Sequence, residues 1–325
     1  MTFLVTGGSG FIGSNLVDYL LEQCPDDRVI NYSRHTYAFN PRILSHRESD
    51  LRYSFVSGDV CDALLLNSVV RENHVSAIFH LAASTHVDRS FLYPEEFLRN
   101  NVVGTFTILE VVRHMPEEER PKVIYVSTDE VFGDVPPPRL CKEDDSPSPR
   151  NPYSASKASC EMYCQAYYHS FGIPIVISRS MNNFGPRQHP EKLIAKIITR
   201  CLSDTPFTLY EGGSTRGWIY VWDTCDAIHI ILERGGIGKI YHIPPTVYRT
   251  VPEVAEAILE LTGKEHLFQG YKGRRLKDDE RYALDGSRMR DELGWSPKTG
   301  FEDALKDTIK WYEENRWFWE GVSAP

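Results

Sequence analysis

The stretch "VTGGSGFIGSNLVDYLL", residues 5–21, decides the fold. It starts as an apolar run, and Gly7, Gly10 and Gly13 then lead into an amphipathic segment. Because glycine lacks a Cβ atom, this spacing allows a tight turn and lets a pyrophosphate approach the backbone N–H groups of a helix N-terminus. A strand, a turn and a helix in this order are the context that a dinucleotide-binding motif requires. We therefore predict a dinucleotide site here, with a purely structural glycine turn as the alternative.

The same alternation of strand and helix continues over the first 130 residues. Apolar runs rich in Val, Ile, Phe and Tyr predict buried strands at 3–8, 29–33, 52–60, 76–83, 122–128 and, later, 174–186. Helical patterns lie at 12–23, 63–73 and 95–114, and further ones near 191–202, 252–262 and 301–315. This order predicts an α/β fold with a doubly wound parallel Rossmann sheet. We expect the Rossmann domain at 1–185 with returning segments near 218–245, and a smaller C-terminal substrate-binding lobe mainly at 186–325.

Composition is ordinary for a soluble enzyme, with 41% hydrophobic and 25% charged residues. The net charge of −9 argues against a nucleic-acid-binding surface. The seven cysteines form no CxxC pair, which indicates reduced thiols in a cytoplasmic protein and no structural metal. The sequence shows no signal peptide and no apolar run of membrane-spanning length.

Two further stretches carry candidate chemistry. In "NPYSASKASCEMY", residues 151–163, Tyr153 and Lys157 share one face of a predicted helix. A nearby ammonium lowers the pKa of a phenol, which would make Tyr153 a base, although such a pair is by itself usually a solvated helix face. In "VSTDEVFGD", residues 126–134, Thr128, Asp129 and Glu130 follow a predicted strand. Two carboxyls beside a hydroxyl suggest an acid and a base, and a capped helix start is the alternative.

Several motifs together resemble a known family. They are "TGGSGFIGSN" (6–15), "HLAASTHVDRS" (80–90), "STDEVFGD" (127–134), "NPYSASKA" (151–158), "NNFGPRQHPEKLI" (182–194) and "RYALDGSRMRDELGW" (281–295). The chain is similar to the extended short-chain dehydrogenases/reductases and, among them, to the nucleoside-diphosphate-sugar 4,6-dehydratases, with the dTDP-glucose 4,6-dehydratases nearest. The resemblance implies conversion of a dTDP- or UDP-glucose type substrate to the 4-keto-6-deoxy sugar. C4 is oxidised, water leaves across C5 and C6, and hydride returns to C6 from a tightly bound nicotinamide cofactor that is regenerated each cycle.

The resemblance also implies roles for the candidate residues. Thr128 would hold the sugar O4, Tyr153 would be the base for C4 oxidation, and Lys157 would be its partner and bind the nicotinamide ribose. Asp129 would protonate the leaving C6 hydroxyl, and Glu130 would take the C5 proton. By the same resemblance, epimerases of this fold lack this Asp–Glu pair and decarboxylases have a different residue before the glutamate, so the pair disfavours both. A 4-epimerase or a decarboxylase is the enzymatic alternative. An NADP(H)-sensing regulator is the non-enzymatic one.

Binding residues follow by the same resemblance. For the cofactor, in addition to Tyr153 and Lys157, they are Gly7, Gly10, Phe11, Ile12, Gly13, Ser33, Arg34, Asp59, Val60, Leu81, Ala82 and Ala83. For the substrate they are Ser84, Thr85, Asn182, Lys192, Arg216 and Arg275. The family often has glutamate or glutamine at the position of Ser84. The run at 274–280 departs from the family pattern, so thymidine and uridine both stay open as the nucleoside.

The stretch "INYSRHTY", residues 30–37, bears on the choice of cofactor. The family has an aspartate at the position of Ser33, which binds both ribose hydroxyls of NAD and repels a 2′-phosphate. Ser33 removes that repulsion, and Arg34 offers a cation to the phosphate. We therefore predict NADP, with NAD as the alternative if Arg34 lies only on the adenine face.

The oligomeric state is a last expectation. The segments 95–114 and 153–170 are amphipathic, and the resemblance implies that they form the four-helix interface of a homodimer. Ordinary packing on the sheet would give the same pattern.

Overall fold

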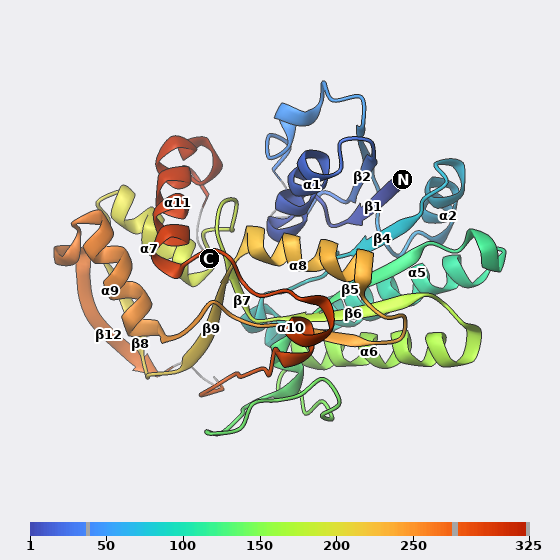
Figure 1. The fold of residues 1–325 in the computed structure, drawn as a ribbon. Helices are drawn as coiled ribbons and strands as arrows, with labels where there is room; N and C mark the ends of the chain where they lie inside the picture. Colours follow the sequence, from blue (N-terminus) through green and yellow to red (C-terminus); the bar gives the residue numbers. More distant parts are fainter. Residues whose placement is uncertain (37–39, 275–278, 323–325) are drawn as a thin grey trace.

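The computed structural model describes residues 1–36, 40–274 and 279–322. Its central element is a seven-stranded sheet in the order β10-β6-β5-β4-β1-β2-β3, in which every neighbouring pair is parallel. The strands are β1 (Thr2–Thr6), β2 (Arg28–Ser33), β3 (Tyr53–Ser57), β4 (Ala77–His80), β5 (Lys122–Thr128), β6 (Ile175–Ser180) and β10 (Ile240–Ile243). The predicted doubly wound Rossmann sheet is confirmed (Figure 1).

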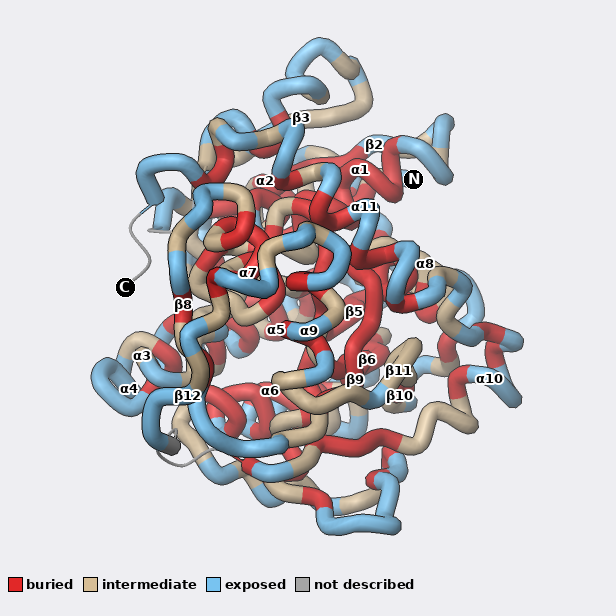
Figure 2. Tube along the Cα trace, turned by 90° about the vertical axis from the view of Figure 1, so that its left-hand side faces the viewer, coloured by how far each residue is buried: buried red, intermediate tan, exposed pale blue. Residues whose placement is uncertain are grey.

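Both faces of this sheet are covered by helices, which explains why its strands read as continuous apolar runs. Along β1, Phe3 and Val5 pack on the face covered by α1 (Phe11–Gln23) and α8 (Val221–Arg234). Leu4 points to the other face, where α2 (Ala63–Glu72), α5 (Gly104–Arg113) and α6 (Pro152–Phe171) lie. Figure 2 shows buried residues concentrated along β5 and β6 and exposed ones along outer elements such as α4 and β12.

Two predicted elements are each divided in the structure. The stretch 174–186 contains β6 and a separate strand, β7 (Asn182–Phe184), because the Asn183 side chain donates to Ser180 Oγ and to the Met181 carbonyl and the chain turns there. The predicted helix 95–114 is interrupted as well. It comprises α4 (Pro94–Phe97), a π-helical segment (Leu98–Val103) and α5, and the short α3 (Val87–Leu92) precedes it.

The C-terminal half builds a smaller lobe, at the left of Figure 1, and also returns to the large sheet. In the lobe, β7 pairs with β9 (Thr215–Tyr220) and β9 with β11 (Val247–Thr250), while β8 (Phe207–Glu211) pairs with β12 (Phe268–Arg274). Its helices are α7 (Leu193–Leu202), α9 (Val251–Thr262) and α11 (Phe301–Glu314), and α10 (Ser287–Leu293) lies near β10. The helix α8 and the strand β10 belong to the large sheet layer, whereas the domain boundary near residue 185 stays a prediction.

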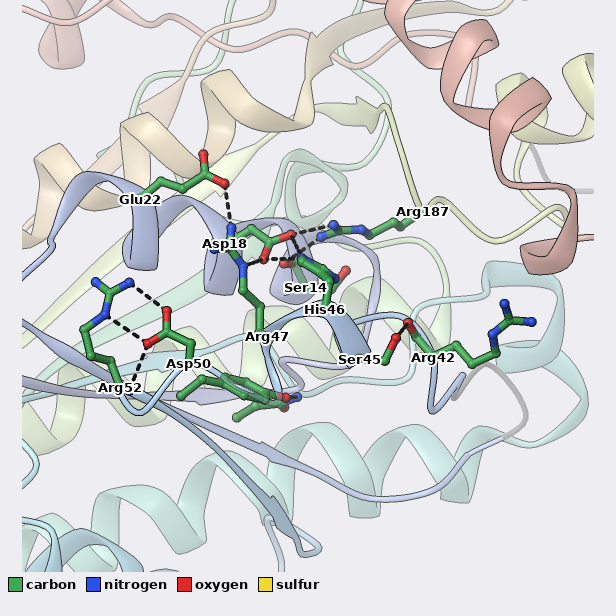
Figure 3. Close-up of polar contacts among 12 residues, drawn as sticks. Ser14, Asp18, Glu22, Arg42, Ser45, His46, Arg47, Asp50, Arg52 and Arg187 are labelled. Carbon is green, nitrogen blue, oxygen red and sulfur yellow. Dashed lines mark hydrogen bonds and ion pairs between the residues drawn. The ribbon is translucent and has the colours of Figure 1, made fainter.

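A buried carboxylate connects the first helix to two distant segments (Figure 3). Asp18 on α1 is only 2% exposed and accepts hydrogen bonds from Arg47 Nε at 2.6 Å, from His46 Nε2 at 3.0 Å and from Arg187. Arg187 lies between β7 and α7 and also donates to the Ser14 carbonyl at 3.0 Å. Asp18 therefore joins the helix behind the glycine turn to the segment after β2 and to the segment that leads into α7.

Candidate active site

The carboxyl ends of the central strands surround one cavity of about 710 Å³. The cavity lies at the ends of β1 and β4, which are neighbours in the sheet. After these two strands the chain continues toward opposite faces of the sheet, and ligands bind at such a point in doubly wound sheets. All of the predicted cofactor residues line it: Gly7, Gly10, Phe11, Ile12, Gly13, Ser33, Arg34, Asp59, Val60, Leu81, Ala82, Ala83, Tyr153 and Lys157. The predicted catalytic residues Thr128, Asp129 and Glu130 line the same cavity.

The glycine turn leaves no room for side chains. Gly7 has φ +74°, and a Cβ atom on it would lie 2.9 Å from the backbone of Ala82. A Cβ atom on Gly13 would lie 2.2 Å from the carbonyl oxygen of Gly7. Gly10 caps α1 without a side-chain hydrogen bond, so the first N–H groups of the helix stay available to a ligand. This cradle fits the pyrophosphate of a dinucleotide.

Beside the glycine turn, Ser33 and Arg34 are both engaged in hydrogen bonds. Ser33 Oγ accepts from the Ser9 N–H at 3.0 Å and donates to Asn31 Oδ1 at 2.8 Å, so it fixes the glycine turn. Arg34 donates to Asp59 Oδ2 at 2.7 Å. Burial raises the pKa of Asp59, but the Cys61 N–H and the Arg34 guanidinium outweigh it and hold this pKa below the usual value. The charge of Asp59 is therefore offset by a cation within the cavity wall.

The two carboxyls that follow β5 lie in unlike surroundings. Asp129 is 3% exposed, and burial together with the nearby Glu130 raises its pKa to about 7. Thr128 Oγ1 donates to Asp129 Oδ1 at 3.0 Å. Asp129 Oδ2 and Ser127 Oγ are buried without a hydrogen-bond partner among the described residues. Buried polar atoms are rarely left unpaired, so these two suggest contacts with a ligand.

The helix α6 begins next to these carboxyls, and the local sequence explains why it begins there. The Asn151 side chain caps the helix through the Ser154 N–H, and Pro152 occupies the first helical turn. The same Asn151 side chain donates to Glu130 Oε2 at 3.4 Å. The start of α6 therefore positions Tyr153 and Glu130 together.

The pKa that we expected for Tyr153 is wrong for this structure. Burial raises the pKa of Tyr153, and the negative charge of Glu130 acts in the same direction. The Lys157 ammonium donates to the Val126 carbonyl at 2.7 Å and lies 4.3 Å from the ring centre of Tyr125. Burial also lowers the pKa of Lys157.

The predicted substrate residues are placed unequally. Ser84, Thr85, Asn182 and Lys192 line the cavity, and Lys192 Nζ donates to the Thr85 carbonyl at 3.3 Å. Arg216 is buried and is not part of the cavity lining; it donates to the Asp279 carbonyl at 2.7 Å. Its positive charge nevertheless acts on Asp129 and partly offsets the rise in that pKa. Arg275 lies outside the described residues.

Other lining residues escaped the sequence interpretation. Among them are Glu96, Phe97, Asn100, His189 and Glu191. Glu96, Phe97 and Asn100 have the spacing of one helix face, which was a usable signal, but nothing in the sequence tells which way that face points. Glu191 has a side chain only 4% exposed and lies 3.9 Å from His86 Nε2 and 3.7 Å from His189 Nδ1.

The described residues include no disulfide, no metal-binding cluster and no membrane-spanning helix. All seven cysteines lie in the described part of the chain, and each is a free thiol. Over residues 1–36, 40–274 and 279–322, no three His, Cys, Asp or Glu side chains are arranged to hold a metal ion. In the same ranges, none of the helices combines the length and apolarity needed to cross a membrane.

A doubly wound sheet, a glycine turn and a Tyr–Lys pair that meet at one cavity define an extended short-chain dehydrogenase/reductase. Comparison with known proteins shows which family within this class the chain belongs to. The model of the GDP-mannose 4,6 dehydratase family matches residues 4–308, and the chain belongs to that family.

Relatives in this family are dTDP-glucose 4,6-dehydratases. The Mycobacterium tuberculosis enzyme is 40% identical over 323 residues, which cover 98% of this chain and 95% of that protein. The Haemophilus influenzae enzyme is 38% identical over 331 residues, covering 96% and 98%. A crystal structure of the Streptomyces venezuelae enzyme with NAD bound superposes with a TM-score of 0.93 at 39% identity, covering 99% of this chain and all of that one.

Proposed function

We propose that this protein is a hydro-lyase that converts a nucleoside-diphosphate glucose, of the dTDP- or UDP-glucose type, to the 4-keto-6-deoxy sugar and water. The observation that carries the proposal is the adjacent Asp129 and Glu130 beside Thr128 and Tyr153, in the same cavity as the glycine cradle. A carboxyl with a pKa of about 7 next to a second carboxyl supplies the acid and base that the loss of water needs.

The residues divide the work as follows. Thr128 holds O4. Tyr153 takes the proton from the C4 hydroxyl, for which its pKa has to fall from the raised value; the positive charge of a bound oxidised nicotinamide would act in that direction. The glycine turn and Lys157 would hold a nicotinamide cofactor, which would supply the oxidation at C4 and the hydride for C6. Glu130 takes the C5 proton, which the C4 ketone makes acidic, while Asp129 gives its proton to the C6 hydroxyl that leaves as water. After the elimination Asp129 is the carboxylate and Glu130 is the acid. As hydride reaches C6, Glu130 returns its proton to C5, and the proton that Tyr153 took from the C4 hydroxyl restores the acid form of Asp129, so the cycle balances.

For the cofactor, we propose NADP, with NAD as the alternative. The support is the charge beside the glycine turn, where position 33 has a hydroxyl instead of a carboxylate and Arg34 lines the cavity. One N–H of Arg34 donates to Asp59, and its guanidinium has further N–H donors for a phosphate. The Streptomyces venezuelae relative with NAD bound keeps NAD in consideration. Identifying the nucleotide released when the purified protein is denatured tests this choice, and release of NAD alone would overturn it.

For the substrate diphosphate, Asn182 and Lys192 are the proposed ligands within the cavity lining. Arg216 and Arg275 stay proposed phosphate ligands from the family pattern. In the structure, Arg216 would first have to give up its hydrogen bond to the Asp279 carbonyl. The nucleoside stays open between thymidine and uridine.

We further propose a homodimer in the cytoplasm. Apolar side chains on adjacent faces of α5 and α6 are exposed, among them Phe106 at 40%, Tyr163 at 41% and Met162 at 50%. The rings of Phe106 and Tyr163 lie 6.1 Å apart, so they belong to one patch. A contiguous exposed apolar patch marks a contact surface.

To test the function, the protein is incubated with dTDP-glucose and with UDP-glucose, and the molecular masses of the products are measured by mass spectrometry. Loss of one water supports dehydration, and an unchanged mass with altered stereochemistry would instead show a 4-epimerase. Loss of carbon dioxide from UDP-glucuronate would show a decarboxylase. No turnover of any of the three, with cofactor bound, would favour the NADP(H)-sensing regulator.

A further inference from the structure

One wall of the cavity has a set of polar contacts that the proposed chemistry does not use. Glu96 reaches from α4 toward the end of β4, where Ser84 Oγ donates to its Oε1 at 2.9 Å. Arg89 donates to Glu96 Oε2 at 3.1 Å and forms an ion pair with it. Asn100 Nδ2 donates to Ser84 Oγ at 2.9 Å. All four residues line the cavity, and together they are called the acceptor wall.

The directions of these hydrogen bonds follow from the groups themselves. An ionised carboxylate can only accept, so the hydroxyl proton of Ser84 must go to Glu96. The Asn100 side chain must then present its NH₂ group, because the Ser84 oxygen has no second proton to give. One lone pair of Ser84 Oγ and further lone pairs of the Glu96 carboxylate stay available. These two groups therefore offer acceptors to a ligand and no donor.

The acceptor wall is held rigidly and lies beside the proposed catalytic groups. Asn101 accepts from the Ser84 N–H at 2.7 Å and donates to the Ser84 carbonyl at 3.0 Å. The ring of Phe97, the residue after Glu96, packs edge-on against the ring of Tyr153 with centroids 6.2 Å apart. A sugar whose O4 lies at Tyr153 would therefore present its neighbouring positions to this wall.

We propose that Glu96 and Ser84 are specificity-determining residues that accept a hydrogen bond from the C3 hydroxyl of the hexose. This inference rests on the proposed function. The reaction acts on C4, C5 and C6, which leaves only the C2 and C3 hydroxyls for recognition. Of these two, the C3 hydroxyl is attached next to C4. Because O4 is proposed to lie at Tyr153 and the acceptor wall lies beside Tyr153, the C3 hydroxyl is the one that reaches the wall. A site built to bind a hydroxyl strongly rejects the analogue that lacks it.

The test is a binding measurement, so that it does not depend on turnover. With protein loaded with reduced cofactor, which cannot oxidise C4, dissociation constants are measured by calorimetry for the dTDP- or UDP-glucose that binds, and for its 2-deoxy and 3-deoxy analogues. We expect the wild type to bind the 3-deoxy analogue about 10- to 100-fold more weakly than the parent sugar, the size of one hydrogen bond to a charged network. Ser84→Ala should bind the parent sugar and the 3-deoxy analogue with equal affinity. Glu96→Gln, whose amide can donate to Ser84 Oγ, should reduce the ratio.

Two controls separate recognition from folding. Ser84→Thr keeps the hydroxyl and should restore the wild-type ratio, and Glu95→Gln changes the neighbouring α4 carboxyl, which does not line the cavity. An unchanged ratio in Ser84→Ala and Glu96→Gln, or discrimination at C2 alone, would overturn the inference. Normal ratios without product formation would instead reject the proposed function. If the wild type binds neither dTDP-glucose nor UDP-glucose, both the inference about the C3 hydroxyl and the proposed function are rejected.

Discussion

Asp129 and Glu130 are neighbours in the chain, yet the strand end gives them different surroundings. Asp129 points into the buried interior beside Thr128, whereas Glu130 is half-buried and accepts from Asn151 at the start of α6. Burial penalises the charged form of a carboxyl, and a second carboxylate adds to the penalty. This is how two identical functional groups acquire the roles of acid and base.

The first prediction at this scale concerns pH. Because the pKa of Asp129 is raised to about 7, its acid form is present below that pH and is lost as the pH rises through it. We expect kcat for dehydration to fall above about pH 7, and Asp129→Asn to reduce it by about 10²- to 10⁴-fold and to abolish that fall. Rate profiles of both proteins between pH 5 and pH 9 measure this. A falling limb that persists unchanged in Asp129→Asn would assign it to another group.

The second residue-scale prediction concerns Glu130. Glu130→Gln keeps the shape and the contact with Asn151 but cannot take the C5 proton. We expect it to retain the cofactor and to lose dehydration by about 10²- to 10⁴-fold. Exchange of the C5 proton with deuterated water, followed by mass spectrometry, should be lost as well. Full activity in this variant would show that Glu130 is not the base that takes the C5 proton.

At the scale of elements, the glycine turn shows how a strand and a helix are joined closely enough to form a cradle. A Cβ atom on Gly13 would lie 2.2 Å from the Gly7 carbonyl oxygen, and this neighbour is backbone that cannot rotate away. We expect Gly13→Ala to weaken cofactor binding by at least about tenfold, since overpacking costs about 1–3 kcal/mol. Nucleotide content after purification and titration with cofactor measure the effect. Gly213→Ala, where a Cβ would meet nothing within 4 Å, is the matched control; equal cofactor content in the two variants would contradict the argument.

Asp18 acts at the same scale, because it fastens α1 to two other segments. Burial raises its pKa, but Arg187, Arg47 and His46 outweigh this and lower the pKa below the usual value. The stabilisation is therefore present above the unfolded-state value and is lost as the pH falls through the lower folded-state value. We expect Asp18→Asn to reduce the free energy of unfolding at neutral pH by about 2–3 kcal/mol, less than for a fully buried pair since its partners are partly exposed.

Urea unfolding at pH 7 and at pH 3 measures that loss, which should shrink at the lower pH. The exposed Asp26, three residues beyond α1, gives the control variant Asp26→Asn, which should match the wild type. A loss that stays the same at both pH values would show that Asp18 contributes packing and not charge.

On the scale of the whole molecule, local patterns predicted much of the fold and tertiary contacts decided the rest. The strand at 122–128 matches β5 residue for residue, because a strand buried on both faces reads as an apolar run, here Val123 to Val126. The break in 95–114 could not be seen, because its apolar period is continuous. There the Asn101 side chain bonds Ser84 and Ser156 from other elements.

The site shows the same division. Asp59 and Glu130 were predicted as site residues from motifs that follow predicted strands, and both line the cavity because parallel strands end at one edge of the sheet. Glu96 was missed because it enters the cavity from a helix whose orientation only packing defines. Likewise, nothing local to Arg216 indicates that the backbone of the 279–280 segment takes its hydrogen bonds.

The last prediction concerns assembly. Val103, Phe106, Met162 and Tyr163 expose apolar surface on α5 and α6 and on the π-helical segment before α5, and a second copy of the chain would cover it. An aspartate placed in such an interface would be buried without a partner, which is costly, so we expect Phe106→Asp to weaken the dimer by about 100-fold or more. Sedimentation over a range of protein concentrations measures this. Leu64→Asp, at an equally apolar but separate exposed position on α2, should stay dimeric. Retained cofactor in both variants shows that they are folded. A wild type that is monomeric throughout, or a Phe106→Asp protein that dimerises as before, would reject this interface.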